Sequence, residues 1–117
     1  MAVRIVHFGS DNLNRVDALK SRGYSVDECI SLTQLHASLV GIPPTDAVVI
    51  AENDETMADH ALSLVRGAST VPLILFRDGN SHYSRAEFDL VVASDSASDA
   101  WLREIADLIA SSMRLNR

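Results

Sequence analysis

The sequence predicts a doubly wound α/β domain, in which a parallel sheet of five strands is covered by helices on both faces. Short apolar runs alternate with amphipathic stretches along the whole chain, which is the order of successive β/α units. Three of the runs are continuously apolar rather than alternating, as strands are when both faces of a sheet are buried. Crossover connections between parallel strands are right-handed, so such units form an open sheet between two helical layers.

The first half of the chain is expected to contain three strands and two helices. The first helix follows Ser10 or Asp11, either of which can cap it, and ends at Gly23. The second helix has a capping box, in which Ser31 precedes Gln34 by three residues. The expected strands are residues 3–8, 24–30 and 46–51.

The second half is expected to contain two helices and two strands. A helical stripe runs over residues 55–66 and is closed by Gly67, and a polar stretch at residues 94–99 precedes a last helix that fades near Met113. The interval 78–87 has turn formers and no apolar stripe, which predicts a loop or a short helix instead of a full fourth helix. The expected strands are residues 71–76 and 88–93, and the expected sheet core is Ile5, Val48, Val49, Ile50, Leu73, Ile74 and Leu75.

Length and charge restrict the class of protein. A chain of 117 residues corresponds to one domain, residues 1–117. A net charge of −6 disfavours nucleic acid and anionic membrane surfaces as partners. No apolar stretch approaches the ~18 residues of a membrane span, and the start of the chain lacks the apolar region of a secretory signal. With Cys29 as the single cysteine, we expect a cytoplasmic protein.

The order of elements, together with the segment Asp46-Ala47-Val48-Val49-Ile50-Ala51, resembles a response-regulator receiver domain over the whole chain. The resemblance implies a five-stranded parallel sheet in the order 2-1-3-4-5. It also implies a set of positions at which the family carries out phosphoryl transfer. These positions can be placed on this chain one at a time.

The family's magnesium-binding acidic pair falls at Gly9-Ser10, with Asp11 just beyond it. Its phosphoacceptor aspartate falls at Ala51, or at Glu52 if the strand runs one residue longer. Phosphoryl transfer to a carboxylate requires a divalent cation that neutralises the developing charge. The chain therefore resembles a receiver that lacks both the acceptor and the acidic pair.

Two further positions of the family also differ here. Its Ser or Thr after the fourth strand falls at Arg77, and its lysine after the fifth strand falls near Ala93 or Ser94. The sequence contains no lysine after Lys20. We therefore expect a signalling or protein-interaction module that is not phosphorylated, has no catalytic residue and is not an enzyme, with no cofactor and no metal.

Two alternatives remain open. Asp11 and Glu52 supply two carboxylates if both point into one cleft, which would allow magnesium or phosphate to bind, with Arg77 pairing with Glu52 in place of a cation. A third class is a small flavodoxin-like ligand-binding protein, with a phosphate held at Gly9-Ser10-Asp11. That loop has no G-x-G-x-x-G and no P-loop lysine.

A protein partner, including a second copy of the chain, is expected on one face. The family commonly uses its fourth helix, fifth strand and fifth helix as an output and dimer face. A shortened fourth helix here would uncover apolar surface, because aromatic side chains would lose their cover. The residues expected near this patch are Tyr83, Phe88, Leu90 and Trp101.

The histidines and the cysteine give no chemical motif in sequence. His7 lies in the first strand and is expected to be packed, whereas His36 and His60 lie on different helices and are expected to be solvated. His82 falls in the polar interval, and no two histidines have metal-ligand spacing. Cys29 is expected to be a small buried hydrophobe.

Overall fold

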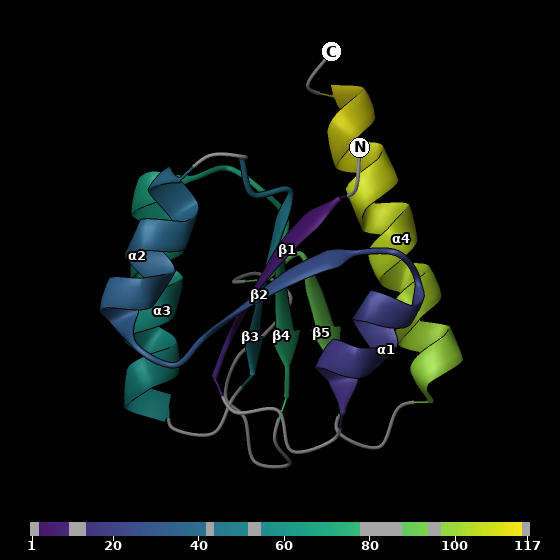
Figure 1. Cartoon of the computed structure of the whole chain (residues 1–117), viewed down its shortest axis with the longest axis horizontal. Coiled ribbons are helices and arrows are strands. Elements are labelled where there is room, and N and C mark those ends of the chain that lie inside the picture. The colour runs from purple at the N-terminus through teal and green to yellow at the C-terminus, as the bar shows by residue number, and fades with distance from the viewer. Residues whose placement is uncertain are drawn as a thin grey trace.

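A computed structural model of the chain describes residues 3–9, 14–41, 44–51, 55–77, 88–93 and 97–115. Its centre is a parallel sheet of five strands in the order β2-β1-β3-β4-β5 (Figure 1). The predicted fold class and strand order are therefore confirmed. The strands are β1 (Arg4–Phe8), β2 (Ser25–Cys29), β3 (Ala47–Ala51), β4 (Leu73–Phe76) and β5 (Leu90–Val92).

In the described part of the chain, two helices cover each face of the sheet. The pair α2 (Leu32–Val40) and α3 (Glu55–Ala68) lies on one side, and α1 (Arg15–Ser21) and α4 (Ser98–Leu115) lie on the other (Figure 1). Successive residues of a strand point to opposite faces, so a strand buried between two layers must be apolar at every position. In β3, for example, Val48 packs in the α2/α3 layer and Val49 in the α1/α4 layer.

The expected core is confirmed. All seven residues predicted for it are fully buried, namely Ile5, Val48, Val49, Ile50, Leu73, Ile74 and Leu75. The strand register places the apolar centres of β1, β3 and β4 side by side, with Val6 opposite Val48 and Val48 opposite Leu73. The continuous apolar runs in the sequence correspond to this doubly covered centre of the sheet.

The two first helices begin differently. For α2, Ser31 accepts a hydrogen bond from the backbone N–H of Gln34 at 3.2 Å, which confirms the predicted cap. The Gln34 side chain accepts from the N–H of Ile30 at 2.9 Å, one residue before the expected position. For α1, the expected cap at Ser10 or Asp11 is wrong, because Asn14 is the N-cap in a left-handed conformation (φ 54°), which asparagine tolerates better than most residues.

Several boundaries also differ from the expectation. The helix α3 continues through Gly67 to Ala68, where the N–H of Ser69 still donates to the carbonyl of Val65 at 2.9 Å. The helix α4 extends to Leu115, and each strand is shorter than its apolar run. The interval 78–87, with its expected loop or short helix, lies outside the described residues. Within the part of the chain that is described, no helix is long and apolar enough to cross a membrane.

Candidate functional site

Open α/β sheets bind ligands at the carboxyl edge of the sheet, where the parallel strands end. Among the described residues, Gly9 follows β1, Ala51 ends β3, Arg77 follows β4 and Ala93 follows β5. The parallel register brings these strand ends to one edge of the sheet. The two carboxylates expected nearby, Asp11 and Glu52, lie outside the described residues.

Gly9 and Ala51 approach each other closely at the ends of β1 and β3. Gly9 has φ +106°, and a Cβ at this position would lie 2.7 Å from the carbonyl oxygen of Ala51 and 3.3 Å from its Cβ. The backbone N–H of Gly9 donates to the carbonyl of Cys29 at 2.9 Å, which holds it in place. Any side chain at position 9, including a carboxylate, would therefore require the backbone to move.

Arg77 is the first residue after β4 and is half-buried. Its backbone N–H donates to the carbonyl of Val92 at 2.8 Å, which continues the pairing of β4 with β5 by one residue. The expected pairing of Arg77 with Glu52 involves a residue outside the described part of the chain. What is described is a cationic residue directly after β4, where the resemblance led us to expect the position of the family's hydroxyl.

Arg15 is a second cation near this edge, and sequence reasoning missed it. Its guanidinium carbon lies 4.4 Å from the centroid of the Phe76 ring, a cation–π distance, and its Nη2 donates to the Ala93 carbonyl at 3.4 Å. Arg15 is 9% exposed, so the charge is held against the protein rather than in water. As the first residue of α1, it crosses from that helix to the ends of β4 and β5.

An aromatic cluster continues inward from Arg15. Phe76 meets Trp101 edge-on, with ring centroids 5.1 Å apart and ring planes inclined by 64°. The ring centroids of Phe76 and His7 lie 6.1 Å apart. Edge-to-face pairs of this kind are favourable because the positive ring edge meets the negative ring face. His7 is fully buried in β1, as expected for a packed strand residue.

Three of the four residues expected at an interface are described, and all three are buried. Phe88, Leu90 and Trp101 are only 1%, 8% and 3% exposed, so they belong to the core of the monomer. The physical reason is that β5 pairs with β4 and packs against α4, which buries Leu90 and turns Trp101 inward against Phe76. Phe88 is buried in the α2/α3 layer instead. Tyr83 lies outside the described residues.

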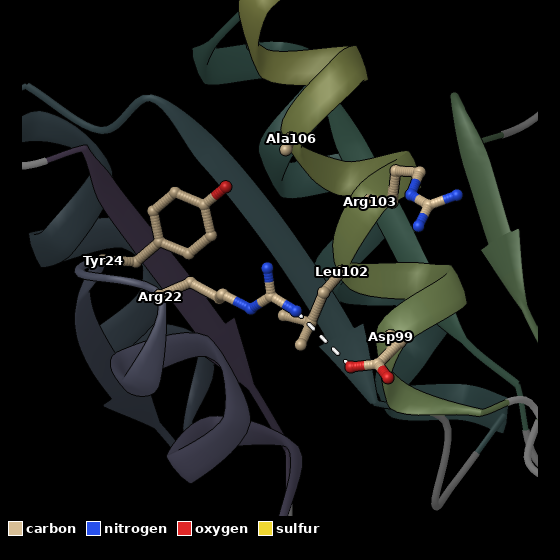
Figure 2. Close-up of a pocket in the computed structure, with 6 residues that line it drawn as sticks. All are labelled: Arg22, Tyr24, Asp99, Leu102, Arg103 and Ala106. Atoms are coloured by element: carbon tan, nitrogen blue, oxygen red, sulfur yellow. Dashed lines mark hydrogen bonds and ion pairs between the residues drawn. The ribbon is translucent and has the colours of Figure 1, made fainter.

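A pocket of about 550 Å³ opens on the α1/α4 face (Figure 2). In it, Arg22 extends from the end of α1 toward α4, and its Nη2 lies 3.4 Å from Asp99 Oδ1. Both side chains are exposed, so this ion pair contributes at most ~1 kcal/mol and is weakened by salt. The pocket is lined by Arg22, Tyr24, Asp99, Leu102, Arg103 and Ala106.

The cysteine and the two helical histidines lie in the described part of the chain. Cys29 is buried, with Sγ 3.4 Å from the Ser38 hydroxyl, as expected for a small core residue. His36 and His60 are exposed, as expected, but they line a common groove between α2 and α3, which sequence spacing did not reveal. In the described part of the chain, no group of three or more His, Cys, Asp and Glu side chains is arranged to hold a metal.

No family model matches the sequence, and no curated protein matches it. Solved structures do match. The N-terminal domain of the nisin resistance regulator NsrR, a lantibiotic response regulator, superposes with a TM-score of 0.73 at 14% identity, covering 93% of this chain and 99% of that one.

Two other structures agree over nearly the whole chain. A response regulator receiver modulated diguanylate cyclase from Pelobacter carbinolicus has a TM-score of 0.69 at 16% identity, with 97% of each chain covered. An orphan response regulator of H. pylori has a TM-score of 0.64 at 13% identity, covering 92% of this chain and 96% of that one. This chain therefore has the fold of response-regulator receiver domains.

Proposed function

We propose that this chain is a receiver-like signalling module that acts through protein interaction and is not phosphorylated at the end of β3. The observation that supports the proposal is that β3 ends at Ala51, the residue to which the resemblance to receivers assigns the acceptor position when the strand ends there. A methyl group has no oxygen to accept a phosphoryl group. The module is not an enzyme in this proposal, and it takes no cofactor.

The fold supports the signalling part of the proposal. The similar structures are response regulators by name, and in one of them the receiver modulates a diguanylate cyclase. A receiver of this kind passes a state to a protein partner, so the partner proposed here is another protein or a second copy of this chain. Fold likeness alone does not determine function. The proposed absence of phosphorylation therefore depends on the residues at the sheet edge.

The close approach of Gly9 to Ala51 supports the absence of phosphorylation. Magnesium in proteins is held by one or two carboxylates with water, and position 9 has no space for any side chain. Without a cation bound at the edge, charge developing on a transferred phosphoryl group would not be neutralised. The missing carboxylate at Ala51 and the lack of space for a side chain at Gly9 both disfavour phosphoryl transfer at this edge.

The net charge and the single cysteine support the proposed type of partner and the proposed cytoplasmic location. A net charge of −6 disfavours a nucleic-acid partner. Cys29 is a buried free thiol, which accords with the reducing cytoplasm. The partner in this proposal is therefore a protein of the cytoplasm.

The decisive experiment is incubation of the protein with acetyl phosphate and Mg²⁺, followed by intact-mass spectrometry. We expect no added mass, and calorimetry should detect no Mg²⁺ binding at the sheet edge. A phosphodonor-competent receiver treated in parallel should gain one phosphoryl group and serves as the positive control.

The two alternatives give different outcomes in the same samples. A stable phosphoryl increment that disappears in Glu52→Gln would overturn the proposal in favour of an atypical receiver using Asp11 and Glu52. A flavin absorption band in the purified protein would instead support a flavodoxin-like ligand-binding function. Neither outcome is expected.

A further inference from the structure

The pocket between α1 and α4 differs from the sheet edge in both its residues and its charge. Its lining shares no residue with the strand ends described above, and its volume of about 550 Å³ is typical of small-molecule sites. Two arginines and one aspartate give the lining a net positive charge, although the whole chain has a net charge of −6. We propose that this pocket binds a small organic carboxylate with an apolar body.

One wall of the pocket is a single face of α4. Asp99, Leu102 and Ala106 are separated by three and four residues, so they lie on the same side of this helix, with Arg103 beside them. Leu102 is buried, and together with the Ala106 methyl group it provides the apolar part of this wall. The wall therefore offers an apolar surface next to charged groups.

The other wall is the turn that joins α1 to β2. Arg22 is the C-cap of α1, and Gly23 takes φ +88° at the turn that leads to Tyr24. The N–H groups of Arg22 and Gly23 donate to the carbonyls of Leu19 and Lys20 at 3.1 and 3.0 Å, which holds the turn together. Figure 2 shows Arg22 and Tyr24 extending from this turn towards α4.

The polar groups of the pocket have donors available for a ligand. The Arg22 guanidinium has five N–H donors and contacts a carboxylate with one nitrogen, Nη2, which lies 3.4 Å from Asp99 Oδ1. Within the described part of the chain, no hydrogen bond or ion pair engages the Tyr24 hydroxyl or the Arg103 guanidinium. Since arginine and a carboxylate can form two parallel hydrogen bonds, Arg22 is the group that would hold the ligand's carboxylate.

Asp99 shows that Arg22 accepts a carboxylate here, and it also competes with the ligand. The Asp99 side chain is 89% exposed and that of Arg22 is 53% exposed, so water screens their ion pair and the pair opens readily. A ligand carboxylate at Arg22 replaces this interaction. Burial of the ligand's apolar body against Leu102 and the Tyr24 ring adds a contribution that the ion pair lacks.

The experiment titrates the ¹⁵N-labelled full chain with benzoate, whose ring supplies the apolar body, and follows the backbone amide signals by NMR. We expect saturable shifts at the lining residues, with one benzoate per chain. Benzamide is the neutral isostere and acetate lacks the ring, so the dissociation constant of each should be about tenfold higher than that of benzoate. Added salt should weaken the binding of benzoate, because the contact with Arg22 is between charges.

Three variants test the assignment. Arg22→Gln should raise the dissociation constant of benzoate about tenfold, because the charged hydrogen bonds are lost. Asp99→Asn should lower it about threefold, because the competing carboxylate is removed, and damage to the fold would not produce tighter binding. The matched control Arg66→Gln removes an exposed arginine of α3, on the other face of the sheet, and should stay within about twofold of the wild type.

Several results would overturn this assignment. They are equal binding of benzamide and benzoate, an unchanged dissociation constant in Arg22→Gln, no tighter binding in Asp99→Asn, and amide shifts confined to the sheet edge. The pocket contains none of the strand-end residues, so its failure would leave the proposed absence of phosphorylation unaffected.

Discussion

At the scale of the residue, two small residues lie at the ends of neighbouring strands of the sheet. Gly9 and Ala51 meet where β1 and β3 finish, and neither carries a functional group. Gly9 also needs a positive φ, which glycine adopts without the steric cost that other residues pay. The close approach of these two residues leaves no space for a side chain at position 9.

The change Gly9→Ala tests this close approach. The new Cβ would meet backbone atoms of Ala51 at 2.7 Å in addition to the unfavourable φ, so we expect a loss of about 2–5 kcal/mol in the free energy of unfolding. Gly23→Ala is the matched control, because Gly23 also has a positive φ (+88°) but no atom within 4 Å of the added Cβ. Its loss should be about 1–2 kcal/mol, from backbone strain alone.

Urea unfolding of the two glycine variants beside the wild type measures both losses. Equal losses at the two positions would mean that the contact with Ala51 relaxes easily. In that case, position 9 would have space for a side chain, and the argument that no carboxylate fits there would fail.

At the scale of the element, α1 depends on tertiary contacts. It has seven residues, and its N-cap Asn14 makes no side-chain capping bond. Helices this short are not stable alone in water, because nucleation costs more than a few hydrogen bonds return. Burial of Val16 and Leu19 and the contacts of Arg15 with Phe76 and the Ala93 carbonyl hold α1 against the sheet.

A double-mutant cycle measures the Arg15–Phe76 contact. Arg15→Met keeps the length and apolar stem of the side chain, and Phe76→Leu keeps an apolar group without the aromatic face. We expect a coupling energy of about 0.5–2 kcal/mol, as for a partly desolvated cation–π pair. Arg103→Met, at an exposed arginine of α4, is the control and should change stability by less than about 0.5 kcal/mol.

Chemical denaturation of the four cycle proteins provides these values. A coupling energy indistinguishable from zero would show that Arg15 acts only through packing of its stem. The attachment of α1 to the sheet would then rest on Val16 and Leu19.

At the scale of the whole molecule, the sheet separates two apolar layers that are filled from different parts of the chain. One layer is closed by α2 and α3, and the other by α1 and α4. Trp101 is a member of the second layer, where it packs on Phe76. Its role is therefore to join the last helix to the sheet.

Trp101→Ala should cost about 3–5 kcal/mol, the usual loss for removing a large buried aromatic ring. Before mutation, the native fluorescence should be that of a buried ring and should shift to the red on unfolding. Light scattering should give the same molecular mass for the wild type and for the variant under conditions in which both fold. A change of mass in the variant, without a loss of stability, would return Trp101 to a subunit interface.

Much of the fold could be predicted from sequence because its signals are local. Continuous apolar runs marked β3 and β4, the pair Ser31 and Gln34 marked the start of α2, and all seven predicted core residues are buried. The helix ends were harder to predict. A glycine commonly ends a helix by taking a left-handed conformation, but at Gly67 the helix continues to Ala68.

The sequence by itself determined that this chain forms a layered α/β domain with no acceptor carboxylate at Ala51, since both follow from which residues occupy each run. Tertiary structure alone decided which distant side chains meet. The contact of Arg15 with Phe76, the approach of Gly9 to Ala51 and the shared groove of His36 and His60 each join different elements. The physical reason is that strand order and helix packing, rather than spacing along the chain, set these distances.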